Sequence, residues 1–337
     1  MEYADKIIFN DIKYDKVYNG SELVVKTEIE PTKALSFTAL ENSVIRFVKA
    51  TDSPEVFPIN MQYRYEYDSR FTDFGTDYIR LNKGEKIYVR GDNPNGLSYY
   101  DEDTELWKHS HFIIDLGKVE ANGNIMSILD GGRCTRMDVP EYCFYGLFKD
   151  CTALVTAPAI QAETLGYYCY GEMFSGCTSL IKSPNLLSKT LDTGCYYNMF
   201  AGCTSLTTPS DLPADMLQRN CYIGMYRDCT SLVNAPAISA NRLASGCFYM
   251  MFKGCTSLTK APELLSNSSV EHCYWEMFQD CINLNYVKCA TKVYDSINFS
   301  DWLTNVSPTG DFYCYDASIF PRGTSGIPEG WTVHSEI

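Results

Sequence analysis

Histidine is scarce in this sequence, and the motifs that build most catalytic sites are missing. The chain holds four histidines, no C-x2-C pair, no phosphate loop, no dinucleotide-binding fingerprint and no G-x-S-x-G motif. Structural zinc sites need four convergent ligands at short spacings, so no zinc site is expected. His109 and His111 share one face of a predicted strand, an arrangement that can bind a metal, and we interpret them instead as outward-facing polar residues. We therefore expect no metal and no cofactor, and we interpret the chain as non-enzymatic.

Long hydrophobic runs and an excess of basic residues are also absent. No stretch approaches the about 18 apolar residues of a membrane span, so no membrane insertion is expected. The formal net charge of −14 at pH 7 disfavours nucleic acid and anionic lipid as partners, because like charges repel. The start, MEYADKIIFNDIKYDK, has no basic n-region and no long apolar h-region, and no cysteine precedes Cys134. We expect neither a signal peptide nor an N-terminal lipid anchor.

Two series of cysteines with a fixed step of 26 residues are the main feature that is present. The first series is Cys143, Cys169, Cys195, Cys221, Cys247 and Cys273, and the second is Cys151, Cys177, Cys203, Cys229, Cys255 and Cys281. Six units without insertion or deletion indicate a repeat array. Such arrays usually offer extended binding surfaces and seldom carry catalysis of their own.

The pattern inside one unit predicts a short helix followed by a short strand. Apolar residues at i, i+1, i+4, i+5 and i+8 favour a helix, and they are Cys143, Phe144, Leu147, Phe148 and Cys151. Gly or Asp always precedes the second cysteine, which predicts the end of that helix. A constant leucine, first Leu154, then begins a Thr- and Val-rich stretch that usually ends in proline, typical of a strand.

These elements predict an α/β solenoid, a curved leucine-rich repeat of six 26-residue units. Strands lie about 4.8 Å apart whereas packed helices need roughly 8–10 Å, so the strands are expected on the concave side. We expect four regions: a β-hairpin at 1–30 turned at Asn19-Gly20, an antiparallel β-sandwich at 31–118, the solenoid at 119–298 and a cap at 299–337.

Three segments resemble known proteins. The repeated motif FxGCTSLTxAPxL resembles the BspA-like class of leucine-rich repeats, and the resemblance covers residues 118–298. The segment IIFNDIKYDKVYNGSELVV at 7–25 resembles a hairpin at the start of tail and fibre proteins in tailed phages of gut bacteria. The ending GIPEGWTV, with Trp331, resembles the end of repeat-bearing phage and prophage proteins.

The fifteen cysteines can be disulfides, zinc ligands or core residues. Equivalent positions on packed helices are about 8–10 Å apart, beyond the roughly 7 Å limit between Cα atoms of a disulfide. The C-x7-C pair within a unit spans about 12 Å of helix. We therefore predict buried, reduced cysteines that pack as small apolar residues in a protein made in a reducing cytoplasm.

Two rows of residues are candidate ligand-binding surfaces. The aromatic row, on the predicted convex side two residues after the first cysteine, consists of Tyr145, Tyr197, Tyr249 and Trp275, with Gly171 and Ile223 in the other units. The polar row, on the predicted concave side two residues after the leucine, includes Lys182, Asn234, Lys260 and Tyr286. The aromatics can instead cover the next coil or pack between protomers, and the polar row can be a solvated surface.

The resemblances together imply a non-catalytic phage virion protein, such as a tail fibre, head fibre or decoration protein. The N-terminal region would contact other virion proteins, and the repeats would present a surface to a host glycan or protein for adhesion or receptor binding. We expect an oligomer in the particle. The alternatives are a purely structural virion component and a bacterial cell-surface adhesin, which would need an export signal.

Overall fold

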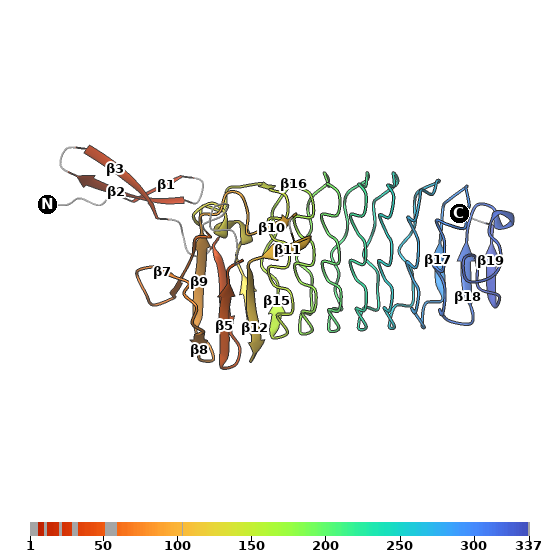
Figure 1. Ribbon diagram of the computed structural model, residues 1–337, viewed down its shortest axis with the longest axis horizontal. Helices are drawn as coiled ribbons and strands as arrows, with labels where there is room; N and C mark the ends of the chain where they lie inside the picture. The colour runs from red at the N-terminus through yellow and green to blue at the C-terminus, as the bar shows by residue number, and fades with distance from the viewer. Residues whose placement is uncertain are drawn as a thin grey trace.

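The structure, a computed structural model, describes residues 6–9, 12–19, 22–28, 33–50, 59–102 and 104–335. Figure 1 shows two β-rich ends joined by a stack of similar coils. Strands β1 (Lys6–Phe9), β2 (Ile12–Asn19) and β3 (Glu22–Glu28) pair antiparallel in that order. Gly20 of the predicted Asn19-Gly20 turn lies outside the described residues.

Two sheets pack face to face before the coils. One has the order β12-β5-β8 and the other β15-β13-β4-β9-β6-β7. Phe37 of one sheet meets Phe112 of the other with ring centroids 5.1 Å apart. The strands are β4 (Leu35–Ala39), β5 (Ser43–Val48), β6 (Met61–Tyr65), β7 (Thr72–Asp73), β8 (Ile79–Leu81), β9 (Lys86–Gly91), β12 (His111–Leu116), β13 (Val119–Asn122) and β15 (Leu154–Thr156).

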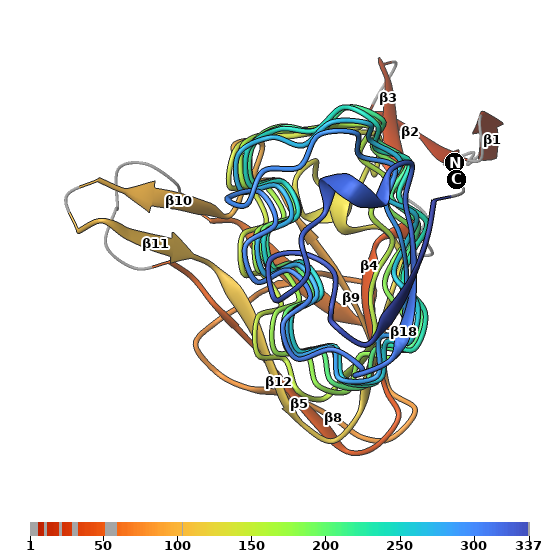
Figure 2. The same ribbon diagram turned by 90° about the vertical axis from the view of Figure 1, so that its right-hand side faces the viewer.

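A separate hairpin, β10 (Ser98–Asp101) with β11 (Leu106–His109), projects from the side of the stack (Figure 2). β18 (Gly310–Tyr313) lies on the other side of the stack in the same view. The short strands β14 (Asp138–Val139) and β16 (Thr164–Leu165) pair parallel between the first coils.

Parallel contacts link each coil to the next. β13 pairs parallel with β15, so the larger sheet continues into the first coil. Further along, single bridges join Thr156 to Lys182 and Lys182 to Thr208, and others join Asn234 to Lys260 and Lys260 to Tyr286. The described sheets are small, and none of them forms a solenoid.

The predicted α/β solenoid, with one helix per unit, is wrong. The described residues contain no α-helix, and their helical segments are short 3-10 turns such as η2 (Ile125–Ile128) and η3 (Ala317–Ile319). The segment between the two cysteines is a chain of turns in which every fourth residue is left-handed, as at Tyr142 (φ 56°), Gly146 (φ 63°) and Asp150 (φ 60°). A left-handed residue at this interval breaks the i to i−4 hydrogen bonds of a helix.

The backbone donors of this segment serve the next coil instead. The Phe144 N–H donates to the Cys169 carbonyl at 2.8 Å, and the Phe148 N–H donates to the Met173 carbonyl at 2.9 Å. Glycine, asparagine and aspartate, which tolerate a left-handed backbone, fill most of the left-handed positions in the later coils. The apolar pattern therefore has a period of four, which over nine residues resembles the 3.6 period of a helix.

The predicted curvature is also wrong. In Figure 1 the coils follow one another along a nearly straight line. Both sides of each coil are linked to the next by backbone hydrogen bonds or bridges, so both rise by about 4.8 Å per coil. The stack has no packed helices to widen one side, and the terms convex and concave do not apply.

Two columns of stacked rings fill the stack. Neighbouring rings in each column have centroids 5.3 to 6.0 Å apart and planes within 13°. One column is Phe112, Phe148, Phe174, Phe200, Tyr226, Phe252 and Phe278, and the other is Phe144, Tyr170, Tyr196, Tyr222, Phe248 and Tyr274. Phe112 belongs to β12, so the core runs unbroken from the sheets into the coils.

The C-terminal end closes the stack. Phe299 and Trp302 contact the last rings of the two columns, with centroids 5.0 Å from Tyr274 and 6.4 Å from Phe278. The Trp302 Nε1–H donates to the Gly326 carbonyl at 2.8 Å. Beside them, β17 (Tyr286–Lys288), β18 and β19 (Trp331–His334) form a parallel sheet.

Candidate functional site

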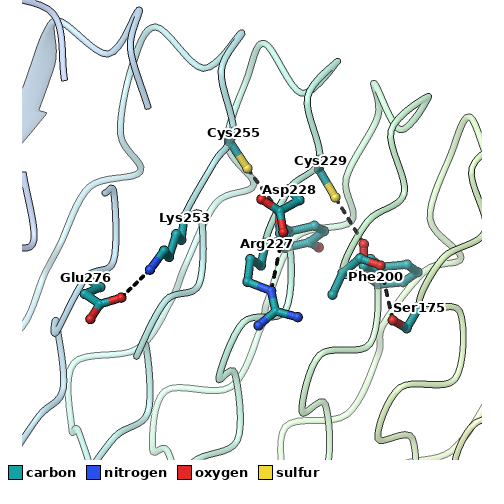
Figure 3. A network of polar contacts seen from close by, with 10 residues as sticks. Ser175, Phe200, Arg227, Asp228, Cys229, Lys253, Cys255 and Glu276 are labelled. Atoms are coloured by element: carbon teal, nitrogen blue, oxygen red, sulfur yellow. Dashed lines mark hydrogen bonds and ion pairs between the residues drawn. The ribbon is translucent and has the colours of Figure 1, made fainter. Parts of the chain in front are cut away.

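The cysteines belong to the core. All fifteen are free thiols and all but Cys134 are buried, which confirms the predicted burial. In the second series Cys151 donates to the Phe112 carbonyl of β12, and each later thiol donates to the carbonyl of an aromatic residue in the preceding coil, all at 3.0 to 3.1 Å. Figure 3 shows one of these bonds, from Cys229 to Phe200. The coils contain no helices, so the helix spacing that we used to exclude disulfides is wrong. The thiols are nevertheless free, and these hydrogen bonds hold them in place.

Burial also makes these thiols unreactive. It raises the pKa of Cys273 and of Cys289 to about 12, and it raises the pKa of the other buried thiols of both series well above the ordinary range. Since the thiolate is the nucleophile and the metal ligand, the array offers neither function at neutral pH.

The described residues show neither a metal-binding cluster nor a membrane-spanning helix. The rings of His109 and His111 lie 5.1 Å apart, yet no described group of three His, Cys, Asp or Glu residues is placed to hold a metal ion. Among the described residues, no helix has the length and apolar character needed to cross a membrane.

The aromatic row lies on the turn side of the coils. Tyr145 is buried, with 4% of its surface exposed, whereas Tyr197, Tyr249 and Trp275 are half-buried. The Tyr249 and Trp275 rings stack with centroids 5.0 Å apart and planes at 26°. The structure thus brings Tyr249 and Trp275 together, while Tyr145 and Tyr197 belong to a separate group.

That group forms a cleft, here called the tyrosine cleft, of about 620 Å³. Its walls are Tyr100, Tyr142, Tyr145, Tyr167, Tyr168, Glu172 and Tyr197. Tyr100 comes from β10, the projecting hairpin, and the other residues come from the first three coils. Ring contacts join its wall from Tyr142 through Tyr168, whose centroids are 6.3 Å apart, to Tyr197, whose centroid lies 5.5 Å from that of Tyr168.

A missing side chain keeps the cleft open. Gly171 occupies the aromatic-row position in the second coil, and a Cβ there would come within 2.6 Å of two ring carbons of Tyr145. The Tyr145 ring therefore lies across Gly171 and forms the floor between the first and third coils. Any larger residue at Gly171 would displace the ring.

Glu172 is the one carboxylate among the described residues that line the cleft. It has a left-handed backbone (φ 52°), and its Oε2 accepts from the Lys149 Nζ of the preceding coil at 2.7 Å. Burial raises the pKa of Tyr145, and the nearby Glu172 raises it further. Burial also raises the pKa of Tyr142 to about 12. At neutral pH the phenols of Tyr142 and Tyr145 are therefore neutral, beside a compensated ion pair.

The polar row lies along the column of parallel bridges that ends at Tyr286 of β17. β18, which pairs with β17, lies on the side of the stack away from the β10–β11 hairpin (Figure 2). Lys182 and Asn234 are exposed, and Asn234 and Lys260 border a shallow groove of about 490 Å³ with Pro236. The Lys260 Nζ lies 4.6 Å from the centroid of the Tyr286 ring. The structure brings Asn234, Lys260 and Tyr286 into adjacent coils but leaves Lys182 two coils away.

Sequence reasoning missed five residues of the tyrosine cleft. They are Tyr100, Tyr142, Tyr167, Tyr168 and Glu172. Tyr142, Tyr168 and Glu172 are bulky residues at left-handed positions that glycine or asparagine occupies in other coils, which is a signal readable from the repeat alignment. Tyr100 gives no such signal, because its place depends on where the β10–β11 hairpin lies.

Comparison of the chain with protein-family models, curated proteins and solved structures finds no match. The resemblance to BspA-like repeats therefore stays a prediction.

Proposed function

We propose that this chain is a non-catalytic carbohydrate-binding protein that holds a host surface glycan in the tyrosine cleft. The observation that supports this proposal is the gathering of six tyrosines and one carboxylate around an open cleft. Tyrosine combines an apolar ring face with a polar hydroxyl, so it can stack on the C–H face of a sugar and hydrogen-bond its hydroxyls.

The ion pair favours a neutral sugar over a cationic ligand. An aromatic cage for a quaternary ammonium group works through ring faces, and a free carboxylate strengthens it. In this cleft Lys149 already compensates Glu172 at 2.7 Å. The carboxylate still has lone pairs that can accept hydroxyl hydrogen bonds.

The number of carboxylates in the cleft also favours binding of a glycan over its hydrolysis. Glycosidases generally use two carboxyl groups, about 5–9.5 Å apart, on either side of the scissile bond. The described wall of the cleft supplies Glu172 alone, and it is held in an ion pair. We therefore assign the cleft to adhesion.

The proposed setting is a phage particle, as a tail fibre, head fibre or decoration protein, and it rests on the resemblance of residues 7–25 and of the C-terminal segment to phage proteins. The N-terminal strands would contact other virion proteins, and several copies would be present. Mass spectrometry of purified virions should detect the chain. Deleting residues 1–30 should leave the coils folded but prevent incorporation, and normal incorporation would remove the docking role.

The cleft is tested by variants assayed for binding to host cells and to a glycan array. Tyr197→Ala should lower binding at least tenfold, and Gly171→Ala should do the same by displacing the Tyr145 ring. Tyr67→Ala, on a tyrosine that is 72% exposed and outside the cleft, is the matched control. Full binding by both cleft variants would exclude the cleft, and loss only when Lys182, Asn234 and Lys260 become alanine would move the site to the polar row.

A further inference from the structure

A second group of residues repeats the chemistry of the tyrosine cleft four coils further along the stack. In the cleft, Lys149 pairs with Glu172 of the next coil at 2.7 Å. The same two positions of the repeat hold Lys253 and Glu276, which pair at 2.6 Å (Figure 3). Both glutamates are left-handed, with φ of 52° and 51°, and both are mostly buried.

Aromatic rings accompany the second ion pair as they do the first. Tyr249 and Trp275 stack beside it at 5.0 Å, and the His272 ring lies 4.8 Å from that of Trp275. Trp275 and His272 also border an open depression of about 430 Å³ with Ile297. The second group therefore offers aromatic side chains at an accessible depression, beside a compensated and mostly buried carboxylate.

A weakly paired cation, Arg227, lies next to this group. Arg227 extends from the coil before Lys253 (Figure 3). Its Nε is buried and has no hydrogen-bond partner among the described residues, and the closest paired carboxylate, Asp228, lies at 3.6 Å. The Arg227 side chain is 40% exposed, so its other guanidinium N–H groups can donate to a ligand oxygen at this point.

We infer that Tyr249, Trp275 and Glu276 form a second sugar subsite, and that the ligand is one extended chain of β-1,4-linked pyranoses lying along the stack across both subsites. This inference rests on the proposed glycan-binding function. Four coils at about 4.8 Å each separate the two carboxylates by about 19 Å. One coil rises by close to the length that one pyranose adds to an extended chain, so about five sugar units span the two subsites.

The order of residues in the aromatic row supports the linkage. Tyr145, Tyr197 and Tyr249 occupy alternate coils, and Gly171 and Ile223 lie between them. In an extended β-1,4 chain successive sugars are turned over, so every second unit presents the same face. From Tyr145 to Tyr249 a ring in every second coil matches that period, and Trp275 adds one further ring in the coil directly after Tyr249.

The test uses chito-oligosaccharides of two and of six units, with isothermal titration calorimetry of the full chain. The wild-type protein should bind the hexamer at least tenfold more tightly than the dimer, because the second contact becomes intramolecular. It should take up two dimers but one hexamer per chain.

Trp275→Ala should bring the hexamer affinity down to that of the dimer and reduce the dimer stoichiometry to one. Tyr315→Ala, on a tyrosine that is 45% exposed and outside both subsites, should change neither value. Thermal unfolding of each variant checks that the coils remain folded, and Tyr249→Ala serves as the second variant.

The remaining outcomes distinguish a failure of the second subsite from a failure of the proposed function. Equal affinity for dimer and hexamer, or a hexamer affinity unchanged by Trp275→Ala and Tyr249→Ala, overturns the second subsite. If the second subsite fails in this way, the proposed function still stands when the tyrosine cleft binds sugar and Tyr197→Ala abolishes that binding. If neither oligosaccharide binds, the β-1,4 ligand is wrong, and the glycan array decides separately whether the cleft binds another sugar.

Discussion

Replacing Phe200 by leucine tests whether stacked rings hold the coils together. Phe200 is fully buried, and its ring lies 5.6 Å from those of Phe174 and Tyr226, with interplanar angles of 1° and 9°. Leucine keeps the site apolar but removes both stacks. An aromatic pair contributes about 0.5–1.5 kcal/mol beyond its buried area, so two pairs contribute about 1–3 kcal/mol.

The change of side-chain shape adds a smaller cost. Apolar exchanges of similar volume usually cost less than about 1.5 kcal/mol, so Phe200→Leu should lower the free energy of unfolding by about 2–4 kcal/mol in total. Met199→Leu is the matched control, because Met199 is equally buried in the same coil but belongs to neither ring column. Its cost should stay below about 1.5 kcal/mol.

Urea unfolding followed by tyrosine and tryptophan fluorescence measures both variants. Comparable m-values are required, since a changed slope would indicate that the coils no longer unfold together. In a stack whose units contact only their neighbours, a weakened interface acts on both adjoining coils. If Phe200→Leu and Met199→Leu lower stability equally, ring stacking does not stabilise the stack and the reasoning fails.

Three further predictions concern the thiols and the leucines. Thiol titration of the native protein should react with Cys134 at most, whereas the denatured protein should release all fifteen thiols; disulfides within the coils would contradict the buried free thiols of the two series. The contribution of the buried thiols to stability should be constant below about pH 8.5, the thiol pKa in the unfolded chain, and should fall as pH rises toward the folded pKa of Cys289, about 12. Urea midpoints between pH 7 and 10, with reductant present, should show this decline, and a flat profile would refute it. Leu206→Ala, at a fully buried position, should cost about 2–5 kcal/mol, and Tyr197→Ala, at a half-buried one, should cost clearly less; equal losses by urea unfolding would contradict the assignment of inner and outer faces.

The repeat and its inward-facing residues could be read from the sequence. A constant 26-residue step fixes which positions are equivalent, and an apolar residue retained at every step has to face the interior. Leu154, Leu180, Leu206 and their equivalents are all fully buried, as are the cysteines of both series. This inference needs only the period and the hydrophobic effect, so it holds whatever backbone conformation connects the residues.

The backbone conformation itself required the structure. Over nine residues, a turn chain with a period of four and a helix with a period of 3.6 place Cys143, Leu147 and Cys151 on one face alike. The difference is where the N–H groups donate, and here they donate to the next coil. The glycines and asparagines at left-handed positions carried this information, but the sequence shows their residue type and not their dihedral angles.

The tyrosine cleft also depended on tertiary structure. Tyr145 and Tyr197 occupy the same position of the 26-residue repeat, so the sequence could place them on one side of the stack. Tyr100 joins them from β10, far from the coils in sequence, because the hairpin lies beside the first coils. Local patterns determine which way a side chain faces, whereas the meeting of distant segments depends on the packing of the whole core.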